Sequence, residues 1–372
     1  MFPPERLAGY VASVCADIGN AAVIAERLGG EVEEVDSIYF GGGTPSLLST
    51  DLVREFFVTL RETFVICDAP EITVECAPNS LSDETLDALV KAGVNRISFG
   101  AQSFVDRETS SVARLHKAED TVRDVGRIRA AGIENVSVDL IAGLPHQTLE
   151  SWDYSISQAL DLGLPHLSVY MLEVDEDSRL GREVMAGGVR YHAHSVPDEE
   201  NVVRMYEHAI ERLGQAGVPQ YEISNFARPV CESRHNLKYW VRDSYFGFGA
   251  DAHSMLHSPA PGVRDIRFAT QEELTDFESA TDHYNGKVQT LNNREALEES
   301  LIVGLRLNRG VDLQQLASEY GEDPATIFSE EIRELANAEL VEHNEHALRL
   351  TPRGRLLSNE VFERFLTTTA RI

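Results

Sequence analysis

The chain has 372 residues and a formal net charge of −28, because 61 aspartates and glutamates outnumber 33 lysines and arginines. This length allows two or three domains, and the negative charge excludes a protein that covers nucleic-acid phosphates over a long surface. No apolar run approaches the roughly 20 residues that span a bilayer, and no secretory signal starts the chain, which predicts a cytoplasmic protein. The cysteines form no close pair, so no disulfide framework is expected; they are Cys15, Cys67, Cys76 and Cys231.

The first predicted element is an amphipathic helix over residues 5–28, whose apolar positions recur at steps of three and four. A short apolar strand at 38–40 then opens into three glycines at 41–43. Glycines lack a Cβ, so a ligand can approach their backbone closely. The same pattern is also compatible with a sharp strand-to-helix turn that binds nothing.

Strands and helices alternate through the rest of the first 228 residues. The predicted strands are 71–76, 96–100, 136–141, 167–172 and 220–223, and the predicted helices are 51–64, 82–93, 119–131, 149–162 and 198–216. This alternation predicts an α/β fold, specifically a partial parallel β/α barrel whose first strand is missing. Polar residues at the strand ends would converge on one mouth: Gly41 to Thr44, Glu75, Gln102, Asp139 and Glu173.

The alternation stops at residue 229. Residues 229–290 are rich in aromatic side chains and are predicted to form a connector that closes one end of the barrel. Residues 291–372 combine helices at 294–305, 312–320, 322–338 and 352–366 with short strands at 340–342 and 347–350, which predicts a winged-helix-like domain. Residues 292–372 hold 9 arginines, no lysine and 15 acidic residues, a charge that disfavours a DNA-binding regulator.

Nine motifs follow one another along the chain: YFGGGTPSLL, VECAP, FGAQSF, VARLH, VDLIAGLPHQT, LSVYMLE, YEISNFA, HNLKYW and GFGADAHS. Together they resemble the radical S-adenosylmethionine (SAM) enzymes related to oxygen-independent coproporphyrinogen III dehydrogenase. HNLKYW and the C-terminal domain are similar to the heme-chaperone branch of this family. The resemblance implies a protein that binds heme and SAM and delivers heme to acceptor proteins, with any membrane contact peripheral and made through the acceptor.

The resemblance also implies a SAM site. Gly42, Gly43 and Thr44 match a glycine motif whose backbone meets the methionine amine, and Glu75 matches an acidic residue that faces the same amine. The other positions are Gln102 for the nucleoside, Arg114 for the SAM carboxylate and Asp139 for the ribose. Taken singly, Glu75 is equally well explained as a surface or structural carboxylate and Gln102 as a turn-forming amide, and a lone arginine such as Arg114 is usually a solvated surface group.

The HNLKYW motif implies a heme contact through His235, Asn236, Tyr239 and Trp240. A histidine can ligate iron, and aromatic rings can cover a porphyrin face. The alternative is an aromatic plug at the barrel end with a hydrogen-bonded histidine. His253 and Cys231 are weaker candidates for the same role.

One defining feature of the family is absent from this sequence: the Cys-x3-Cys-x2-Cys loop that holds a [4Fe–4S] cluster. The expectation is therefore that this chain binds no cluster and performs no radical chemistry. Either the true start lies upstream, or the chain is a cluster-less descendant that keeps the fold for binding. The alternative function is an N-terminally truncated coproporphyrinogen III dehydrogenase, an enzyme of porphyrin biosynthesis.

Overall fold

The computed structural model describes residues 4–42, 45–173, 182–183, 186 and 190–366. The chain divides into two compact units. Unit 1 contains Met1–Asp36, Asp51–Pro70 and Arg234–Ile372, and unit 2 contains Ser37–Thr50 and Glu71–Ser233. The domain boundaries expected after residues 228 and 290 remain a prediction.

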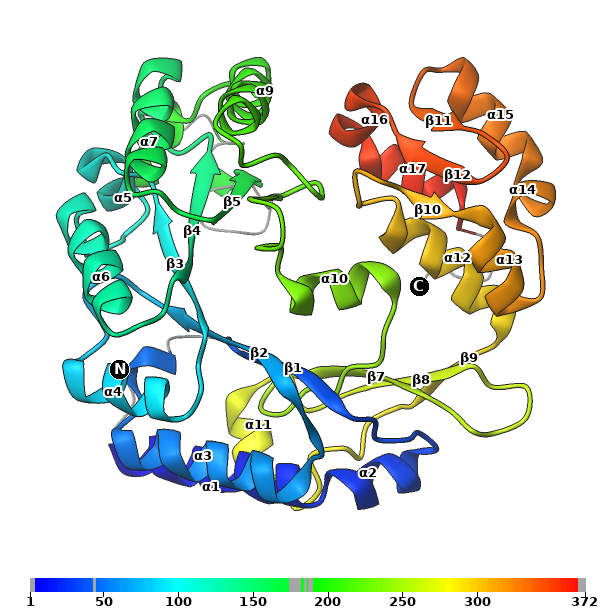
Figure 1. The fold of residues 1–372 in the computed structure, drawn as a ribbon, viewed down its shortest axis with the longest axis horizontal. Helices are drawn as coiled ribbons and strands as arrows, with labels where there is room; N and C mark the ends of the chain where they lie inside the picture. Colours follow the sequence, from blue (N-terminus) through cyan, green and yellow to red (C-terminus); the bar gives the residue numbers. More distant parts are fainter. Residues whose placement is uncertain (1–3, 43–44, 174–181, 184–185, 187–189, 367–372) are drawn as a thin grey trace. The chain divides into compact units, whose positions relative to one another are not determined.

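Unit 2 is built on a six-stranded sheet whose strands follow the order of the chain. They are β1 (Val35–Phe40), β2 (Ile66–Cys76), β3 (Arg96–Gln102), β4 (Asn135–Ala142), β5 (His166–Met171) and β6 (Asn225–Ala227), with the first residues of β1 and β2 assigned to unit 1. Strands β2 to β5 run parallel, and β6 runs antiparallel to β5. This open, curled sheet confirms the predicted partial β/α barrel (Figure 1).

Helices connect the parallel strands and cover one face of the sheet (Figure 1). They are α4 (Asp83–Lys91), α5 (Asp106–Ser111), α6 (Ala118–Ala130), α7 (Leu149–Asp161) and α9 (Glu199–Gln215), with 3-10 turns η1 (Pro45–Leu47) and η2 (Arg190–Ser195). Side chains alternate along each strand, since successive residues point to opposite faces. In β4, Val138 and Leu140 are fully buried, whereas Asp139 between them is partly exposed. The face without helices is therefore the polar one.

The predicted strand at 220–223 is wrong, because the pairing segment is β6 at Asn225–Ala227. Gln220 forms only a single bridge, with Phe226, in the turn that precedes β6. Glu222 is fully buried, and its carboxylate accepts hydrogen bonds from the Ser224 amide (3.0 Å) and from Asn225 Nδ2 (2.5 Å). This buried acid holds a chain reversal that hydrophobic periodicity does not predict.

The predicted single helix at 5–28 is also wrong. It is two helices, α1 (Pro4–Gly19) and α2 (Ala21–Leu28), bent by 63°. The break lies at Asn20, whose Nδ2 donates to the Ala16 carbonyl oxygen at 2.8 Å and so caps the end of α1. The helix predicted at 51–64 is confirmed as α3 (Thr50–Thr63).

The segment predicted as a connector contains a three-stranded antiparallel sheet in unit 1 that was not foreseen. Its strands are β7 (His253–His257), β8 (Asp265–Ala269) and β9 (Gln289–Leu291), and its helices are α10 (Arg234–Val241) and α11 (Leu274–Ser279). Leu256, Ile266 and Phe268 from this sheet share a core with Ile24 and Ala25 of α2. Residues more than 200 positions apart thus complete one apolar cluster.

The C-terminal part of unit 1 has the expected winged-helix-like arrangement, with the strand order β10-β12-β11 (Figure 1). The elements are α12 (Asn293–Gly304), β10 (Val311–Asp312), α13 (Leu313–Tyr320), α14 (Pro324–Ile327), α15 (Ser329–Asn337), β11 (Val341–His343), β12 (Ala347–Leu350), α16 (Pro352–Leu356) and α17 (Ser358–Arg364). The helices predicted at 322–338 and 352–366 are each broken, at Phe328 and at Leu357, where ψ reaches 27° and 30°. Phe328 is buried against Phe365, so the breaks bring two helix ends into one core.

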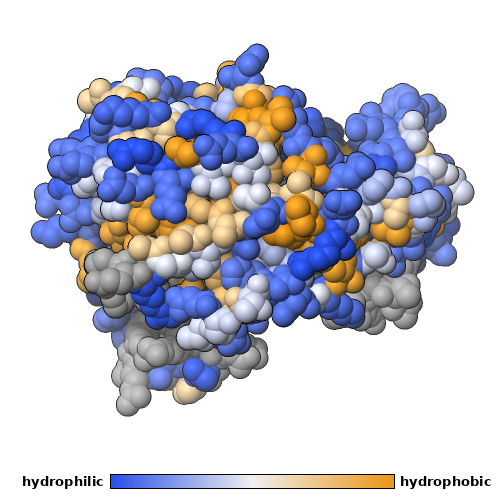
Figure 2. Space-filling model, turned by 90° about the horizontal axis from the view of Figure 1, so that it is seen from below, coloured by the Kyte–Doolittle hydropathy of each residue, from blue (hydrophilic) through white to orange (hydrophobic). Residues whose placement is uncertain are grey.

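Among the described residues, no single helix has the length and apolar composition to cross a membrane; α1 and α2 would meet that criterion only when taken together. One face of the molecule carries hydrophobic residues in separate patches between hydrophilic ones (Figure 2). Val23 of α2, Val58 of α3 and Val65 are examples of exposed apolar side chains in unit 1.

Candidate functional site

The polar face of the sheet in unit 2 brings side chains from four strands together. The Tyr39 hydroxyl donates a hydrogen bond to Glu75 Oε1 at 2.6 Å, and Ser98 Oγ donates to Asp139 Oδ1 at 3.3 Å. Glu75 lies opposite Ser98 in the register of β2 and β3. These residues lie toward the carboxyl ends of parallel strands, where β/α barrels bind ligands. The strand-end site comprises Tyr39, Gly41, Gly42, Glu75, Ser98, Gln102 and Asp139.

The glycine turn packs its backbone closely against the Tyr39–Glu75 pair. A Cβ atom on Gly41 would lie 2.7 Å from Tyr39 Cε1 and 3.0 Å from Glu75 Oε1, so any larger residue would collide with both. Gly42 has φ +75°, a conformation that L side chains rarely adopt. The backbone here is therefore bare and close to a carboxylate. Gly43 and Thr44 lie outside the described residues.

Asp139 has an unusual electrostatic environment. Burial of its carboxyl group and then the negative charge of Glu75 raise the pKa of Asp139 to about 6, although hydrogen bonds from Ser168 and Ser98 act in the opposite direction. Burial and Glu75 also raise the pKa of the Tyr39 hydroxyl, which keeps this donor protonated. Two carboxyl groups that repel each other favour a cationic ligand between them, since such a ligand stabilises both ionised forms.

Gln102 and Arg114 lie at and beyond the end of β3. Gln102 is buried, has φ +67° and lies at a register shift between β3 and β4. Its side chain folds back over Gly100, where an added Cβ atom would lie 2.9 Å from Gln102 Nε2. Arg114 is exposed in the loop after α5. The buried His116 donates from Nε2 to the Ala101 carbonyl oxygen at 3.1 Å, which holds this loop to the strand end.

Sequence reasoning missed Tyr39, Ser98, Ser168 and Tyr170 as neighbours of the predicted carboxylates. Glu75 raises the pKa of Tyr39, and Asp139 adds to the burial that raises the pKa of Tyr170 to about 12. The strand alternation could have identified them. Ser98 lies opposite Glu75 and Ser168 lies opposite Asp139 in the strand register, while Tyr39 and Tyr170 each lie two residues from another residue of the polar face.

The HNLKYW motif forms most of α10 in unit 1, and no residue of this helix is fully buried. His235 Nε2 lies 3.2 Å from the Tyr239 hydroxyl, and the two rings meet edge to face with centroids 5.3 Å apart. Tyr239 packs edge to face against Tyr245, at 4.8 Å, and the Arg306 guanidinium lies 4.3 Å from the centre of the Trp240 ring. Asn236 is also partly exposed. The motif therefore presents a partly exposed aromatic cluster.

The two weaker candidates occupy different surroundings. His253 is exposed at the start of β7, with Nε2 3.6 Å from Asp251 Oδ1. Cys231 belongs to unit 2, and its carbonyl oxygen accepts a hydrogen bond from Arg96 Nη1 at 3.1 Å.

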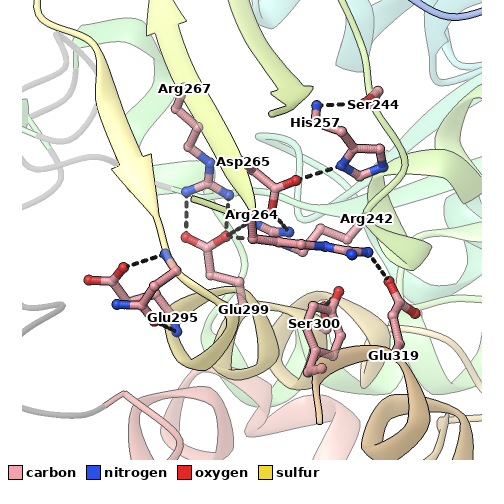
Figure 3. Close-up of polar contacts among 12 residues, drawn as sticks. Arg242, Ser244, His257, Arg264, Asp265, Arg267, Glu295, Glu299, Ser300 and Glu319 are labelled. Carbon is pink, nitrogen blue, oxygen red and sulfur yellow. Dashed lines mark hydrogen bonds and ion pairs between the residues drawn. The ribbon is translucent and has the colours of Figure 1, made fainter. Parts of the chain in front are cut away.

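A buried ionic network anchors the end of α10. Arg242 directly follows the helix, and its Nη1 lies 2.5 Å from Asp265 Oδ2 while its Nε donates to Glu299 Oε2 at 2.9 Å (Figure 3). His257 Nδ1 lies 2.6 Å from the other oxygen of Asp265. Burial opposes ionisation of Asp265, but the contacts with His257 and Arg242 outweigh it and lower the pKa of Asp265. Through these charges α10 is fixed to β8 and α12.

Comparison with known proteins places this chain in a family. The Radical SAM superfamily model matches residues 18–159, and the HemN C-terminal domain model matches residues 291–357. The heme chaperone HemW of Bacillus subtilis is 36% identical over 90% of this chain and 86% of its own length. The chain belongs to the heme chaperone HemW family. HemW of Lactococcus lactis is 32% identical over 93% of this chain and 88% of its own length.

The fold agrees with that of a solved radical SAM enzyme. The structure of coproporphyrinogen III oxidase (HemN) from Escherichia coli superposes with a TM-score of 0.81, at 23% sequence identity, over 98% of this chain and 84% of that one. At this identity the likeness establishes the fold alone.

Radical SAM proteins use SAM with a [4Fe–4S] cluster, and the cysteines described in this HemW-family chain do not fit a cluster. Within the described residues, no group of three or more Cys, His, Asp or Glu side chains is arranged to hold a metal ion. Cys15 and Cys67 belong to unit 1, and Cys76 and Cys231 to unit 2. Burial raises the pKa of Cys76 to about 12, so its thiol stays protonated, whereas a cluster ligand must be a thiolate.

The raised pKa of Asp139 predicts that this residue lowers the stability of the fold. Folding raises the pKa of Asp139 from 3.8 to about 6. Ionisation of Asp139 therefore costs no folding stability below pH 3.8, costs more as pH rises, and reaches its full cost above about pH 6. Asp139→Asn should therefore unfold with a free energy about 1–3 kcal/mol higher than the parent at pH 8, the difference shrinking toward pH 4. Urea unfolding at pH 4.5, 6 and 8 measures this difference.

Asp153 offers a matched control of opposite sign, because hydrogen bonds from His208 and Arg212 lower its pKa despite some burial. Asp153→Asn should lose stability above its pKa, where the ionised pair is present. Equal or lower stability of Asp139→Asn at pH 8 would contradict the assignment.

The ionic network predicts strong coupling between Arg242 and Asp265, whose side chains are almost completely buried. Arg242→Met or Asp265→Leu alone leaves a buried charge without its partner and should cost about 3–5 kcal/mol, while the double variant should cost much less than the sum. The control Arg349→Met breaks an exposed pair with Glu342 and should cost less than about 1 kcal/mol. Urea unfolding followed by tryptophan fluorescence measures each value, and a loss below 1 kcal/mol for both single variants would show that the network is not stabilising.

Proposed function

We propose that the chain is a heme chaperone, which binds heme through the aromatic cluster on α10, binds SAM at the strand-end site, and delivers heme to acceptor proteins. The observation that carries the proposal is that α10 exposes part of every side chain from His235 to Trp240. Large aromatic residues on a short helix normally bury themselves. Their exposure here suits a ligand with a broad apolar face.

The chemistry of α10 supports heme as that ligand. The imidazole of His235 can ligate iron through a ring nitrogen, and Tyr239, which packs against both His235 and Tyr245, lies beside it to contact a porphyrin edge. Burial raises the pKa of Tyr239 to about 12, so its hydroxyl remains neutral near the iron site. Heme is the cargo in this proposal, and transfer requires only that one axial bond be exchanged for a bond in the acceptor.

The chemistry of the strand-end site supports SAM. Glu75 can accept hydrogen bonds from the methionine ammonium group beside the bare backbone of Gly41 and Gly42. Asp139 can accept from ribose hydroxyls, and Gln102 can contact the nucleoside. Arg114, in the loop tied to β3 by His116, is the residue proposed for the SAM carboxylate.

SAM supplies radical chemistry only with an electron from a cluster, and the described cysteines do not fit one. The proposal therefore includes no redox step. In this proposal Glu75 and Asp139 bind a cation between their carboxyl groups, and the Tyr39 hydroxyl keeps its proton and donates it in a hydrogen bond to Glu75.

The heme proposal predicts that His235→Ala lowers heme affinity at least several-fold, because the variant loses its axial nitrogen. Titration of the purified chain with heme, followed by absorption, measures the affinity, and 50 mM imidazole in the buffer should restore part of the spectrum of the ligated iron. Tyr239→Phe removes a hydrogen bond that competes for His235 Nε2, so its heme affinity should match or exceed that of the parent.

Two controls separate ligation from a general loss of structure. His343→Ala removes an exposed histidine on β11, outside α10, and should leave the affinity unchanged. Unchanged circular dichroism of His235→Ala would confirm the fold. If His235→Ala binds heme as tightly as the parent, the motif is an aromatic plug and the heme proposal fails.

The SAM proposal predicts weak but saturable binding. Without cluster iron to chelate the methionine group, the dissociation constant should lie above roughly 1 μM, or about −8 kcal/mol. Glu75→Gln removes the ionised acceptor and should weaken binding by about tenfold, the effect of losing one charge-assisted hydrogen bond. The same change at Glu134, an exposed residue just before β4 at the opposite end of the strands, is the control and should have little effect. Calorimetry that finds equal affinities for Glu75→Gln and the parent would exclude Glu75 from the site.

A further inference from the structure

Three segments of unit 2 bring basic side chains together beyond the carboxyl end of β4. Arg107 lies in α5, His146 lies four residues after β4, and His192 lies in η2. Arg107 Nη2 is 3.2 Å from His146 Nδ1, and the rings of His146 and His192 meet edge to face with centroids 4.9 Å apart. The His146 amide donates to the Ser195 carbonyl oxygen at 2.7 Å, which fixes the two segments to each other.

The contact with Arg107 determines the tautomer of His146. A guanidinium can only donate hydrogen bonds, so Nδ1 of His146 must be the acceptor and its proton must lie on Nε2. The lone pair of Nδ1 is thus used, and Nε2 carries a hydrogen. This ring is therefore arranged to donate a hydrogen bond and not to ligate a metal ion, since a metal needs a free ring nitrogen.

Both histidines adopt a backbone conformation that costs free energy. His146 has φ +69° and His192 has φ +57°, in the left-handed region that residues with a Cβ seldom occupy. Glycine would fit these turns without that cost. Strain retained at two residues in mutual contact is typical of a functional site.

The Arg107 guanidinium gives this cluster a positive charge, in a chain of net charge −28. Partial burial and the charges of Arg107, His192 and His194 lower the pKa of His146, while Glu108 acts in the opposite direction. The carboxylate of Glu108 is bound by Ser103, Ser151 and Gln147. Within the described residues, the Arg107 guanidinium contacts the ring of His146 and forms no ion pair with a carboxylate.

We propose that Arg107, His146 and His192 form a binding site for an oxyanion, a carboxylate or a phosphate group. The guanidinium supplies paired N–H donors that match the geometry of such a group, and the Nε2–H of His146 supplies another donor beside the ring of His192. The site is independent of the heme proposal, because it uses none of the residues of α10, and of the SAM proposal, because it uses none of the residues assigned to that ligand.

The experiment is a titration of the full chain, with ¹³C-labelled histidine rings observed by NMR, against sodium phosphate and sodium acetate at constant ionic strength. Saturable shifts of the His146 and His192 signals, with a dissociation constant of roughly 1 mM or below, are expected for at least one anion. Preference between phosphate and acetate identifies which group the site takes. Shifts that grow linearly, or that sodium chloride reproduces, would overturn the proposal.

Variants test the assignment without depending on the fold. Arg107→Ala should weaken anion binding at least fivefold, and Arg107→Lys should recover only part of it, because lysine keeps the charge but not the paired donors. His146→Asn keeps a residue that tolerates positive φ, so its melting temperature should stay close to that of the parent while the saturable shift of His192 is lost. His343→Ala, an exposed histidine on β11, is the control and should bind as the parent does. Unchanged affinity in both Arg107→Ala and His146→Asn, or stoichiometric binding of Zn²⁺ that displaces the anion, would refute the oxyanion site.

Discussion

The alternation of side chains along the parallel strands is the constraint on which unit 2 depends. Each strand buries one set of residues, such as Val138 and Leu140, against the helices, and this burial fixes which residues must face the other side. Because the strands run in the same direction and in register, Glu75, Ser98 and Asp139 meet on one face. A shift of one residue in any strand would move a carboxylate into the apolar layer at high cost. Core packing and the strand-end site are thus set by the same pairing.

Unit 1 solves a different problem, which is to hold a short helix in place while its aromatic side chains stay accessible. Eight residues of helix have little stability of their own. The buried pair of Arg242 and Asp265, with Glu299 and His257 around it, fixes the end of α10 by charge, where most helices would be fixed by apolar burial (Figure 3). Removing one member of the network leaves a buried charge without a partner, so the network is sensitive to mutation. The intact network holds α10 without burying the helix face that carries His235 and Tyr239. Such an arrangement suits a surface that must accept and release a large apolar ligand.

The strand-end site keeps its carboxylates close together at a cost in stability, which the raised pKa of Asp139 reflects. Selection for stability alone would replace one of them, because two like charges on a partly buried face repel. Their retention is in line with a cationic ligand, whatever the chemistry that follows binding. The oxyanion site proposed at Arg107 and His146 would bind a ligand of opposite charge, and its residues lie in the segments that follow β3 and β4. Unit 2 would then hold a cation and an anion with separate sets of residues.

The sequence by itself determined most of the alternation of strands and helices in unit 2, because hydrophobic period and helix caps such as Ser82 are local properties. Motif order also determined the family, and the pattern of strand ends placed Glu75 and Asp139 on one face. Only the tertiary structure decided features that depend on partners distant in the chain. Asn20 divides the first helix, buried Glu222 turns the chain so that β6 starts at Asn225, and the sheet β7-β8-β9 completes its core with α2. The pairs Tyr39–Glu75, Arg242–Asp265 and Arg107–His146 join residues 36, 23 and 39 positions apart, and no local pattern encodes such contacts.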